Sequence, residues 1–239
     1  EEHKRVTEFI IKKTNKKVPV MAGCGSNSTK ESIDFVKHAK SVGASASLVV
    51  TPYYNKPSQD GLYLHFKKIA DACKDLPVYL YNIPGRSIVK INSDIVKKLS
   101  RVQNIVGVKD ATADLTTPLE IRNKCGKKFQ QLSGEDATFL AFLISGGDGC
   151  ISVTANVAPK LCSEMHNFWQ NGEIKKAQEI NLNLSSLHNA LFLESSPGPV
   201  KYAANLLKLC EKDTRLPLFE IEDKTKIDVK NCLKELNLI

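Results

Sequence analysis

The sequence lacks the features that mark several classes of protein. Among its 239 residues there are seven cysteines but no C-x-x-C pair, so neither a zinc knuckle nor a disulfide framework is predicted. The longest apolar run, Phe139 to Ile144, is far below the ~18 residues that span a bilayer, and no secretory signal is present. The five histidines have no metal-ligand spacing, and the acidic residues form no paired-carboxylate pattern. Free thiols in a reducing compartment fit this composition, so we expect a cytoplasmic protein with no membrane association.

The net charge of +8 is not arranged as a nucleic-acid surface. Lysines are scattered through amphipathic segments, and no aromatic-laced basic stripe accompanies the densest cluster, Lys12-Lys13 with Lys16-Lys17. The hydrophobic fraction of 42% and the charged fraction of 25% are ordinary for a globular protein. We therefore expect a solvated lysine-rich surface and no nucleic-acid partner.

Strand and helix signals alternate through the first two thirds of the chain. Strand ends recur every ~20–30 residues, the period of successive βα units. Because the strands are apolar without alternation and are linked by amphipathic helices, a parallel sheet covered on both faces is predicted. Six strands are expected, at 18–22, 46–50, 78–81, 105–109, 129–132 and 150–153, with helices that include 93–99 and 135–145.

Beyond about Pro159 the strand signals stop, and helical spacing continues to the C-terminus. Repeats such as Leu182, Leu187 and Leu191 predict a helical appendage of about three helices. We expect residues 1–171 to form the sheet-containing part and residues 172–239 to form a C-terminal helical domain.

Six strands fit either an open doubly wound sheet or most of a closed eight-stranded barrel. In an open sheet, polar ligand-binding residues gather at one switch point. Here nearly every strand ends in polar or reactive side chains, which favours a (βα)8 TIM barrel with six of its eight strands in this chain. The chain begins at Glu1 rather than at methionine, and we expect the other two strands to precede it.

Lys109 is the strongest candidate for chemistry. It closes the apolar run 105–108, and a lysine at the end of a buried strand is costly unless it is used there. Burial lowers the pKa of an ammonium group, and a neutral lysine is a nucleophile for ketones. Tyr81 ends another strand, and Arg86 lies five residues after it. An amine, a phenol and a guanidinium on one rim predict Schiff-base chemistry on a carboxylated carbonyl substrate.

The remaining motifs have structural interpretations when taken alone. The segment 23–28 could hold an anion, but it lacks the G-x-G-x-x-G spacing and the P-loop lysine, so a tight turn into a helix is favoured. Residues 82–85 by themselves indicate a turn, and Arg86 by itself is more often a surface cation. Tyr53 and Tyr54 are adjacent, so their side chains cannot both enter the same core. Two interpretations stay open: one ring is packed and the other exposed, or the two tyrosines form a functional pair.

Taken together, these residues resemble the dihydrodipicolinate synthase / N-acetylneuraminate lyase family of class I pyruvate-handling aldolases, over the whole chain. The most specific stretches are Tyr81-Asn82-Ile83-Pro84 and Gly107-Val108-Lys109-Asp110, similar to the family's tyrosine and Schiff-base lysine at their separation. Residues 51–57, 132–136 and 149–156 also match. The family's Gly-Thr-Thr-Gly-Glu stretch is absent, and we expect it to lie before Glu1.

The resemblance implies a lyase. Within the family, Arg86 and the Tyr53-Tyr54 pair point to the synthase branch, which condenses pyruvate with aspartate semialdehyde to 4-hydroxy-tetrahydrodipicolinate in the diaminopimelate route to lysine. Arg86 would hold the carboxylate of aspartate semialdehyde. Two alternatives stay open: a sialic acid or 2-keto-3-deoxy sugar acid aldolase of the same family, and a catalytically silent barrel that acts as a binding module.

The other site residues follow from the resemblance as well. Lys109 would form the pyruvate imine, Tyr81 would relay protons, and Tyr54 would reach the site of a neighbouring subunit in a homotetramer, a dimer of dimers. Gly134 and Ile151 would line the pyruvate pocket through backbone groups. Because the imine is the electron sink, no metal and no organic cofactor would be needed.

Feedback inhibition by lysine is a further expectation from the resemblance. Lysine-sensitive synthases bind lysine at a subunit interface through a carboxylate, an asparagine, a tyrosine and a histidine. Residues at similar places here are Glu31, Asn27, Tyr53 and His3. The alternative for Glu31 is structural, because Ser28-x-x-Glu31 has the spacing of a helix capping box.

Overall fold

The computed structural model describes residues 1–239. The chain divides into two compact units: unit 1 comprises residues 1–134 and 142–148, and unit 2 comprises residues 135–141 and 149–239. This division does not coincide with the boundary expected after residue 171, because α8 (Pro159–Gln170) packs against α9 (Ile174–Ala190) within unit 2. No helix combines the length and the apolar character needed to cross a membrane.

Unit 1 is built on a parallel sheet in which neighbouring strands follow the order of the sequence. Its strands are β1 (Met21–Gly23), β2 (Ala46–Val50), β3 (Val78–Asn82), β4 (Ile105–Asp110) and β5 (Gln130–Ser133). The strand expected to begin at Val18 starts only at Met21. Val18 is exposed, and Pro19 has no N–H to contribute to a ladder.

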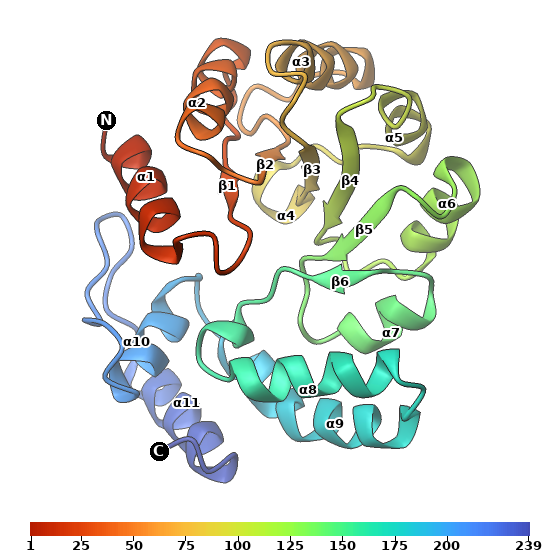
Figure 1. Ribbon diagram of the computed structural model, residues 1–239. Helices are drawn as coiled ribbons and strands as arrows, with labels where there is room; N and C mark the ends of the chain where they lie inside the picture. Colours follow the sequence, from red (N-terminus) through yellow and green to blue (C-terminus); the bar gives the residue numbers. More distant parts are fainter. The chain divides into compact units, whose positions relative to one another are not determined.

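Helices cover one side of these strands (Figure 1). They are α1 (Glu2–Thr14), α2 (Thr29–Ser41), α3 (Gln59–Asp71), α5 (Ser93–Leu99) and α6 (Thr116–Cys125). The short α4 (Pro84–Ser87) directly follows β3 and is not one of these covering helices (Figure 1). Ser28, Ser58 and Asn92 cap α2, α3 and α5 by accepting a backbone N–H of the first turn, so the helix start predicted at Ser28 is confirmed. The helix predicted at 93–99 is also confirmed.

The core of unit 1 lies between the sheet and these helices. Leu80 of β3 and Val49 of β2 pack with Leu62, Phe66 and Ile69 of α3 in one cluster of fully buried side chains. Burial of a side chain of this size contributes about 1.5–3 kcal/mol. Because side chains alternate along a strand, this packing leaves the opposite face of each strand for other residues.

Val6, Phe9 and Ile10 recur at helical spacing in α1, and all three side chains are exposed. The seven cysteines are all free thiols, with Cys24 and Cys73 buried. Cys210 is exposed.

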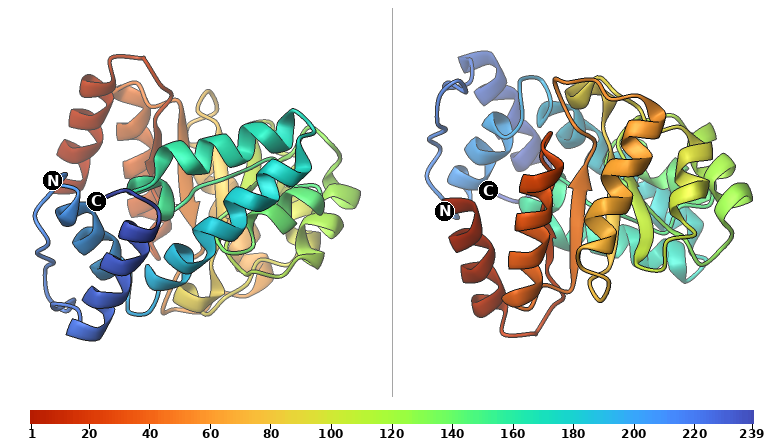
Figure 2. Two further views of the ribbon diagram at one scale, coloured as in Figure 1. Left: turned by 90° about the horizontal axis from the view of Figure 1, so that it is seen from below. Right: turned by 90° about the horizontal axis from the view of Figure 1, so that it is seen from above.

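Unit 2 is largely helical. It contains β6 (Gly149–Cys150), the 3-10 turn η1 (Thr154–Asn156), α8 and α9, and then α10 (Gly198–Leu206) and α11 (Asp223–Glu235). Figure 2 shows α8 and α9 side by side. The three helices α9, α10 and α11 lie within residues 172–239, as predicted. Leu187 and Leu191 are buried in the core of this unit, but Leu182, predicted on the same stripe, is 72% exposed.

Two elements near the junction of the units differ from expectation. The strand predicted at 150–153 ends at Cys150, because the backbone N–H groups of Val153 and Thr154 donate to the Asp136 carboxylate instead of continuing a ladder. The helix predicted at 135–145 is shorter, spanning α7 (Phe139–Ile144). His188 is a core residue of unit 2: it is buried, and its Nδ1 lies 2.7 Å from the Thr154 hydroxyl.

Candidate active site

Lys109 and Tyr81 lie against each other at the carboxyl ends of two neighbouring strands of unit 1. The register of β3 and β4 pairs Tyr81 directly with Lys109. The Lys109 Nζ atom is 4.0 Å from the centroid of the Tyr81 ring, and Lys109 is only 9% exposed. A lysine ammonium over an aromatic face is attracted to the ring. The amine and the phenol that the sequence places on one rim are thus in contact.

The environment of Tyr81 favours its protonated form. Burial raises the pKa of the Tyr81 phenol, and the positive charge of Arg86 partly opposes this rise. A protonated phenol beside an amine can donate a proton to a leaving hydroxyl and recover it later. Arg86 lies in α4, directly after β3, and its side chain is exposed.

A β-bulge sets the register that brings the two residues together. Val78 pairs with Ile105, whereas Tyr79 pairs with Gly107, so β4 contributes one extra residue at this point. Gly107 has no room for a side chain: an added Cβ would lie 2.6 Å from the Gln130 carbonyl oxygen and 2.7 Å from the Tyr79 ring. Glycine at position 107 therefore permits the close approach of β3, β4 and β5 beneath Lys109.

Gly134 is also placed beside Lys109. A Cβ added at Gly134 would lie 2.8 Å from Lys109 Cε and 2.7 Å from Ala111 Cβ. Its backbone N–H donates to the Asp110 carbonyl at 2.6 Å, which holds it at the end of β4. A glycine at this position leaves space for the lysine side chain and exposes backbone groups to whatever binds there. Ile151, expected in the same pocket, belongs to unit 2, where it directly follows β6.

The loops that follow β2, β3 and β4 contain backbone strain. Tyr54, Ile88 and Ala113 have φ values of 71°, 67° and 58°, in the left-handed region that is unfavourable for residues with a Cβ. Such strain is typical of loops held in one conformation for binding or catalysis. Tyr53 and Tyr54 are both exposed, Tyr54 by 87%, so neither ring is the packed member of a pair.

Two buried hydroxyl groups connect these loops, and the sequence analysis did not identify them. Thr51 Oγ1 donates to Ser87 Oγ at 2.7 Å, which ties the end of β2 to α4 and to the Arg86 it contains. Ser87 Oγ is also within hydrogen-bonding distance of the Ile83 and Val89 carbonyl oxygens. The sequence contains only a weak indication of this hydrogen bond, namely that Thr51 is a polar residue directly after an apolar strand.

The residues compared with a lysine site gather around the segment between β1 and α2. His3 Nε2 lies 2.7 Å from the Gly23 carbonyl oxygen. Asn55 Nδ2 donates to the Asn27 carbonyl at 3.0 Å, which links this segment to the loop that contains Tyr53. The structure therefore brings His3, Asn27 and Glu31 to one segment of unit 1.

The capping box expected from Ser28 and Glu31 forms only in part. Ser28 Oγ accepts the Glu31 N–H at 3.4 Å, as a capping serine does. The Glu31 carboxylate accepts a hydrogen bond from the Ser26 hydroxyl, and the Ser28 N–H donates to that same hydroxyl oxygen at 3.1 Å. The role of Glu31 is thus not limited to the cap.

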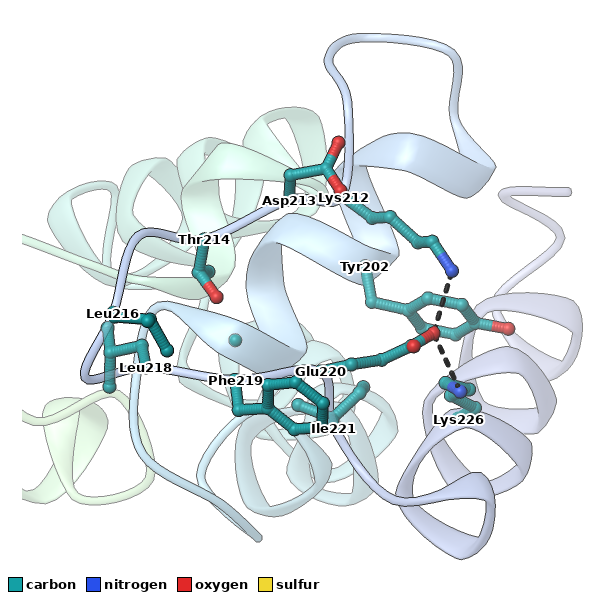
Figure 3. Close-up of a pocket in the computed structure, with 11 residues that line it drawn as sticks. Tyr202, Lys212, Asp213, Thr214, Leu216, Leu218, Phe219, Glu220, Ile221 and Lys226 are labelled. Atoms are coloured by element: carbon teal, nitrogen blue, oxygen red, sulfur yellow. Dashed lines mark hydrogen bonds and ion pairs between the residues drawn. The ribbon is translucent and has the colours of Figure 1, made fainter.

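A cavity of about 400 Å³ lies within unit 2, between α10, the segment 212–221 and α11 (Figure 3). None of the predicted site residues lines it. Lys212 and Lys226 both bind the Glu220 carboxylate, at 2.7 and 3.0 Å, and they lower the pKa of Glu220 to about 2. These three charged groups of the lining therefore bind one another. No cluster of three or more His, Cys, Asp and Glu side chains could hold a metal ion.

Comparison with known proteins agrees with this geometry. The chain matches the sequence model of the Dihydrodipicolinate synthetase family over residues 1–236. It is 51% identical to the 4-hydroxy-tetrahydrodipicolinate synthase of Gluconacetobacter diazotrophicus, covering 100% of this chain and 80% of that protein. Against the protein of the same name from Rhodospirillum centenum it is 52% identical, covering 100% of this chain and 82% of that protein.

Solved structures show the same fold. The dihydrodipicolinate synthase from Aquifex aeolicus superposes with a TM-score of 0.97 at 42% identity, covering 99% of this chain and 81% of that one. The chloride-inhibited enzyme from Acinetobacter baumannii, complexed with pyruvate, gives a TM-score of 0.96 at 43% identity, covering 100% and 81%. The fold is therefore the α/β fold of a (βα)8 barrel, with six strands in this chain and helices at its C-terminal end, as predicted. The chain belongs to the dihydrodipicolinate synthetase family.

Proposed function

We propose that this protein is a 4-hydroxy-tetrahydrodipicolinate synthase, a lyase that condenses pyruvate with aspartate semialdehyde in the diaminopimelate route to lysine. The observation that carries the proposal is the contact of Lys109 with Tyr81, 4.0 Å from Nζ to the ring centroid, at the ends of paired strands. Relatives of that name that are 51% and 52% identical support it.

In the proposed mechanism Lys109 Nζ attacks the ketone carbon of pyruvate, and loss of water gives an imine. The imine draws electrons from the methyl carbon, which loses a proton and becomes an enamine carbon. That carbon adds to the aldehyde of aspartate semialdehyde. The amino group of the second substrate then attacks the imine carbon, closes the ring and releases Lys109. No metal or organic cofactor takes part.

Tyr81 is the proton relay in this mechanism. Dehydration needs a donor for the departing hydroxyl, and later steps need an acceptor for the same proton. The raised pKa of Tyr81 supports this role, because the phenol is protonated at neutral pH. Tyr54, exposed and held at a positive φ, extends the relay in the site of a neighbouring subunit.

Substrate carboxylates have separate sites. Arg86, a planar donor that can bind a carboxylate through two parallel hydrogen bonds, holds aspartate semialdehyde. Its exposed position on α4 suits a substrate that arrives second. Gly134 and Ile151 line the pyruvate pocket through backbone groups, and the proximity of Gly134 to Lys109 Cε supports this assignment for Gly134.

The proposal extends to assembly, location and domain organisation. A homotetramer arranged as a dimer of dimers would let the exposed Tyr54 serve a partner's site. One solved relative, 38% identical, is described as a monomeric variant, so sedimentation analysis of this protein is the direct check. Seven free cysteines support a reducing cytoplasm. The proposed domains are a barrel part, residues 1–171 with strands three to eight, and a C-terminal helical domain, residues 172–239. This division assigns α8 to the barrel as the helix that follows β6, although α8 also packs against α9.

Lysine is the proposed feedback inhibitor. Its ammonium group would bind Glu31, with Asn27, Tyr53 and His3 as the other contacts. The proximity of His3, Asn27 and Glu31 to the segment between β1 and α2 supports this site.

Borohydride trapping tests the central claim. Full-length protein incubated with pyruvate and borohydride should gain mass on the peptide that contains Lys109. In Lys109→Arg the charge is kept, but the guanidinium stays protonated and forms no imine, so trapping should disappear while the fold is retained. Condensation should fall by at least about 10³-fold. Absence of label from Lys109 in the wild type would contradict every Schiff-base function. Two activity assays then separate the alternatives within the family: condensation of pyruvate with aspartate semialdehyde, and cleavage of keto-sugar acids.

A further inference from the structure

Asn82 and Asp110 occupy the positions directly after Tyr81 and Lys109, and the register of β3 and β4 pairs them with each other. Both are buried, Asn82 to 2% and Asp110 to 4% exposure. Asn82 Nδ2 donates to Asp110 Oδ2 at 2.8 Å. Because successive side chains of a strand point to opposite faces, this pair lies on the sheet face opposite to Lys109 and Tyr81.

The other side-chain hydrogen bonds of the pair go to the segments that follow the two strands. Asp110 Oδ1 accepts the backbone N–H of Thr112 at 3.1 Å and the Thr112 hydroxyl at 2.5 Å, which fixes the turn after β4. Asn82 Oδ1 accepts the N–H of Ile91 at 3.1 Å, which fixes the segment that leads out of α4. Both side-chain oxygens of Asp110 act as acceptors in these bonds.

The local geometry explains why a side-chain bond is needed here. The bulge at Val78/Tyr79 leaves only a short stretch of ladder between itself and the strand ends. Gly107, within that stretch, contributes no side chain to fix the pairing. A slip of one residue would move Lys109 to the other face of the sheet, because the side-chain period of a strand is two. A buried hydrogen bond adjacent to the Tyr81–Lys109 pair prevents that slip.

We propose that Asn82 and Asp110 are positioning residues for imine formation, a role that rests on the proposed Schiff-base function. Their hydrogen bond holds the register in which Lys109 Nζ contacts the Tyr81 ring. Through Ile91 it also holds the segment that follows α4, and so the position of Arg86. The pair acts from the far side of the sheet and touches no substrate.

The hydrogen-bond pattern offers an exchange experiment. In the double variant Asn82→Asp with Asp110→Asn, the new carboxylate accepts from Ile91 and from the new amide. The new amide oxygen accepts both Thr112 donors, so every bond is preserved in reverse. Each single variant breaks the pattern. Asn82→Asp sets two carboxylates against each other. In Asp110→Asn the new N–H₂ group faces a donor in either orientation, the amide of Asn82 in one and the donors of Thr112 in the other.

The measurement is the single-turnover rate of pyruvate imine formation per folded molecule, followed by borohydride quench and mass spectrometry. Each single variant should be about 10²-fold slower, because a misplacement of about 1 Å costs that much. The KM for pyruvate should change far less than kcat. The exchange variant should return to within about threefold of the wild type, which is the non-additivity that coupled residues show.

Asn104→Ala is the matched control for stability. Asn104 is a buried asparagine just before β4, and its Nδ2 donates to the carbonyls of Ala70, Cys73 and Leu76. Its replacement should lower Tm but leave the imine rate of the folded molecules unchanged. Thr112→Val is a milder test: it removes one bond to Asp110, should keep the fold, and should slow imine formation about threefold.

The outcomes separate the two proposals. A wild type that traps no pyruvate on Lys109 overturns the proposed function itself. If the wild type traps normally but the folded single variants and Thr112→Val form imine at the wild-type rate, the pair is merely structural and the positioning role is wrong. If both single variants fail to fold, the exchange variant decides. A folded exchange variant that forms the imine about 10²-fold more slowly than the wild type also overturns the positioning role.

Discussion

The residues of the candidate site form two groups that are held in different ways. Lys109 and Tyr81 lie within paired strands and contact each other, and Lys109 is 9% exposed. Arg86 and Tyr54 lie in the segments that follow strands, and both are exposed. Covalent chemistry needs groups fixed to within a fraction of an ångström, which strands provide. Recognition of a second substrate or a second subunit needs accessible groups, which loops provide. The comparison suggests that the chemical step and the recognition step can be damaged separately.

The largest effect in the strand group after Lys109 is expected from Tyr81→Phe. The ring that contacts Lys109 is kept, so only the proton relay is lost, and condensation should slow by about 10²- to 10⁴-fold. Tyr79→Phe is the matched control. Tyr79 is two residues earlier on the same face of β3, but its hydroxyl donates to Gln130. Steady-state kinetics decide: comparable losses in both variants would show that the phenol of Tyr81 has no special role.

Arg86→Ala should separate the two groups. Loss of a hydrogen-bonded charge costs about 1.5–3 kcal/mol, so the KM for aspartate semialdehyde should rise by about 10- to 100-fold. Pyruvate imine trapping on Lys109 should remain, because the strand pair is untouched. Arg101→Ala, which removes another exposed arginine, controls for net charge. A variant in which trapping and condensation fall together would break the division between strand and loop residues.

The sequence predicts the strand residues better than the residues in the segments that follow strands. The strand at 46–50 and the helix at 93–99 were recoverable because each is an apolar pattern bounded by local capping or turn signals. As a candidate, Lys109 was recoverable because a lysine closing a buried strand conflicts with its surroundings, while its role in the reaction stays a prediction. The contact of Lys109 with Tyr81 was not, because it depends on a bulge whose only sequence trace is Gly107.

Features that depend on distant side chains escaped the sequence analysis. The strand predicted at 150–153 ends early because Asp136, 17 residues before Val153, takes its backbone N–H. No local pattern records such a partner. The turn expected at 82–85 leads into α4, which positions Arg86 and is tied to β2 through Thr51 and Ser87. These contacts join residues far apart in the sequence, and the spacing of apolar residues along the chain contains no information about them.

The third prediction concerns the binding of lysine as a regulator at the segment between β1 and α2. Glu31→Ala should weaken the binding of L-lysine by about tenfold or more, because the ligand's ammonium group loses its carboxylate partner. The Lys109–Tyr81 pair is not involved, so imine trapping without lysine should be unchanged. Asp34→Ala is the control, since Asp34 is another acidic residue of α2 but pairs with Lys4 at 2.6 Å. Calorimetry is the measurement; a wild type that does not bind lysine at millimolar concentration would leave Glu31 with structural contacts alone.

The smallest expected effect lies where the two groups meet, in the pKa of Tyr81. Burial raises the pKa of this phenol, and the positive charge of Arg86 lowers it. Arg86→Ala should therefore raise the pKa of Tyr81 further, and only slightly, because solvent screens the exposed guanidinium. The alkaline limit of activity should move to higher pH in the same direction. Arg86→Lys keeps the charge but not the planar donor, so it should restore the pKa of Tyr81 without restoring the KM for aspartate semialdehyde. Ultraviolet titration isolates the Tyr81 signal as the difference between each variant and the same variant with Tyr81→Phe. Equal pKa values for Tyr81 in the wild type and in Arg86→Ala would show that the loop residue has no electrostatic influence on the strand residue.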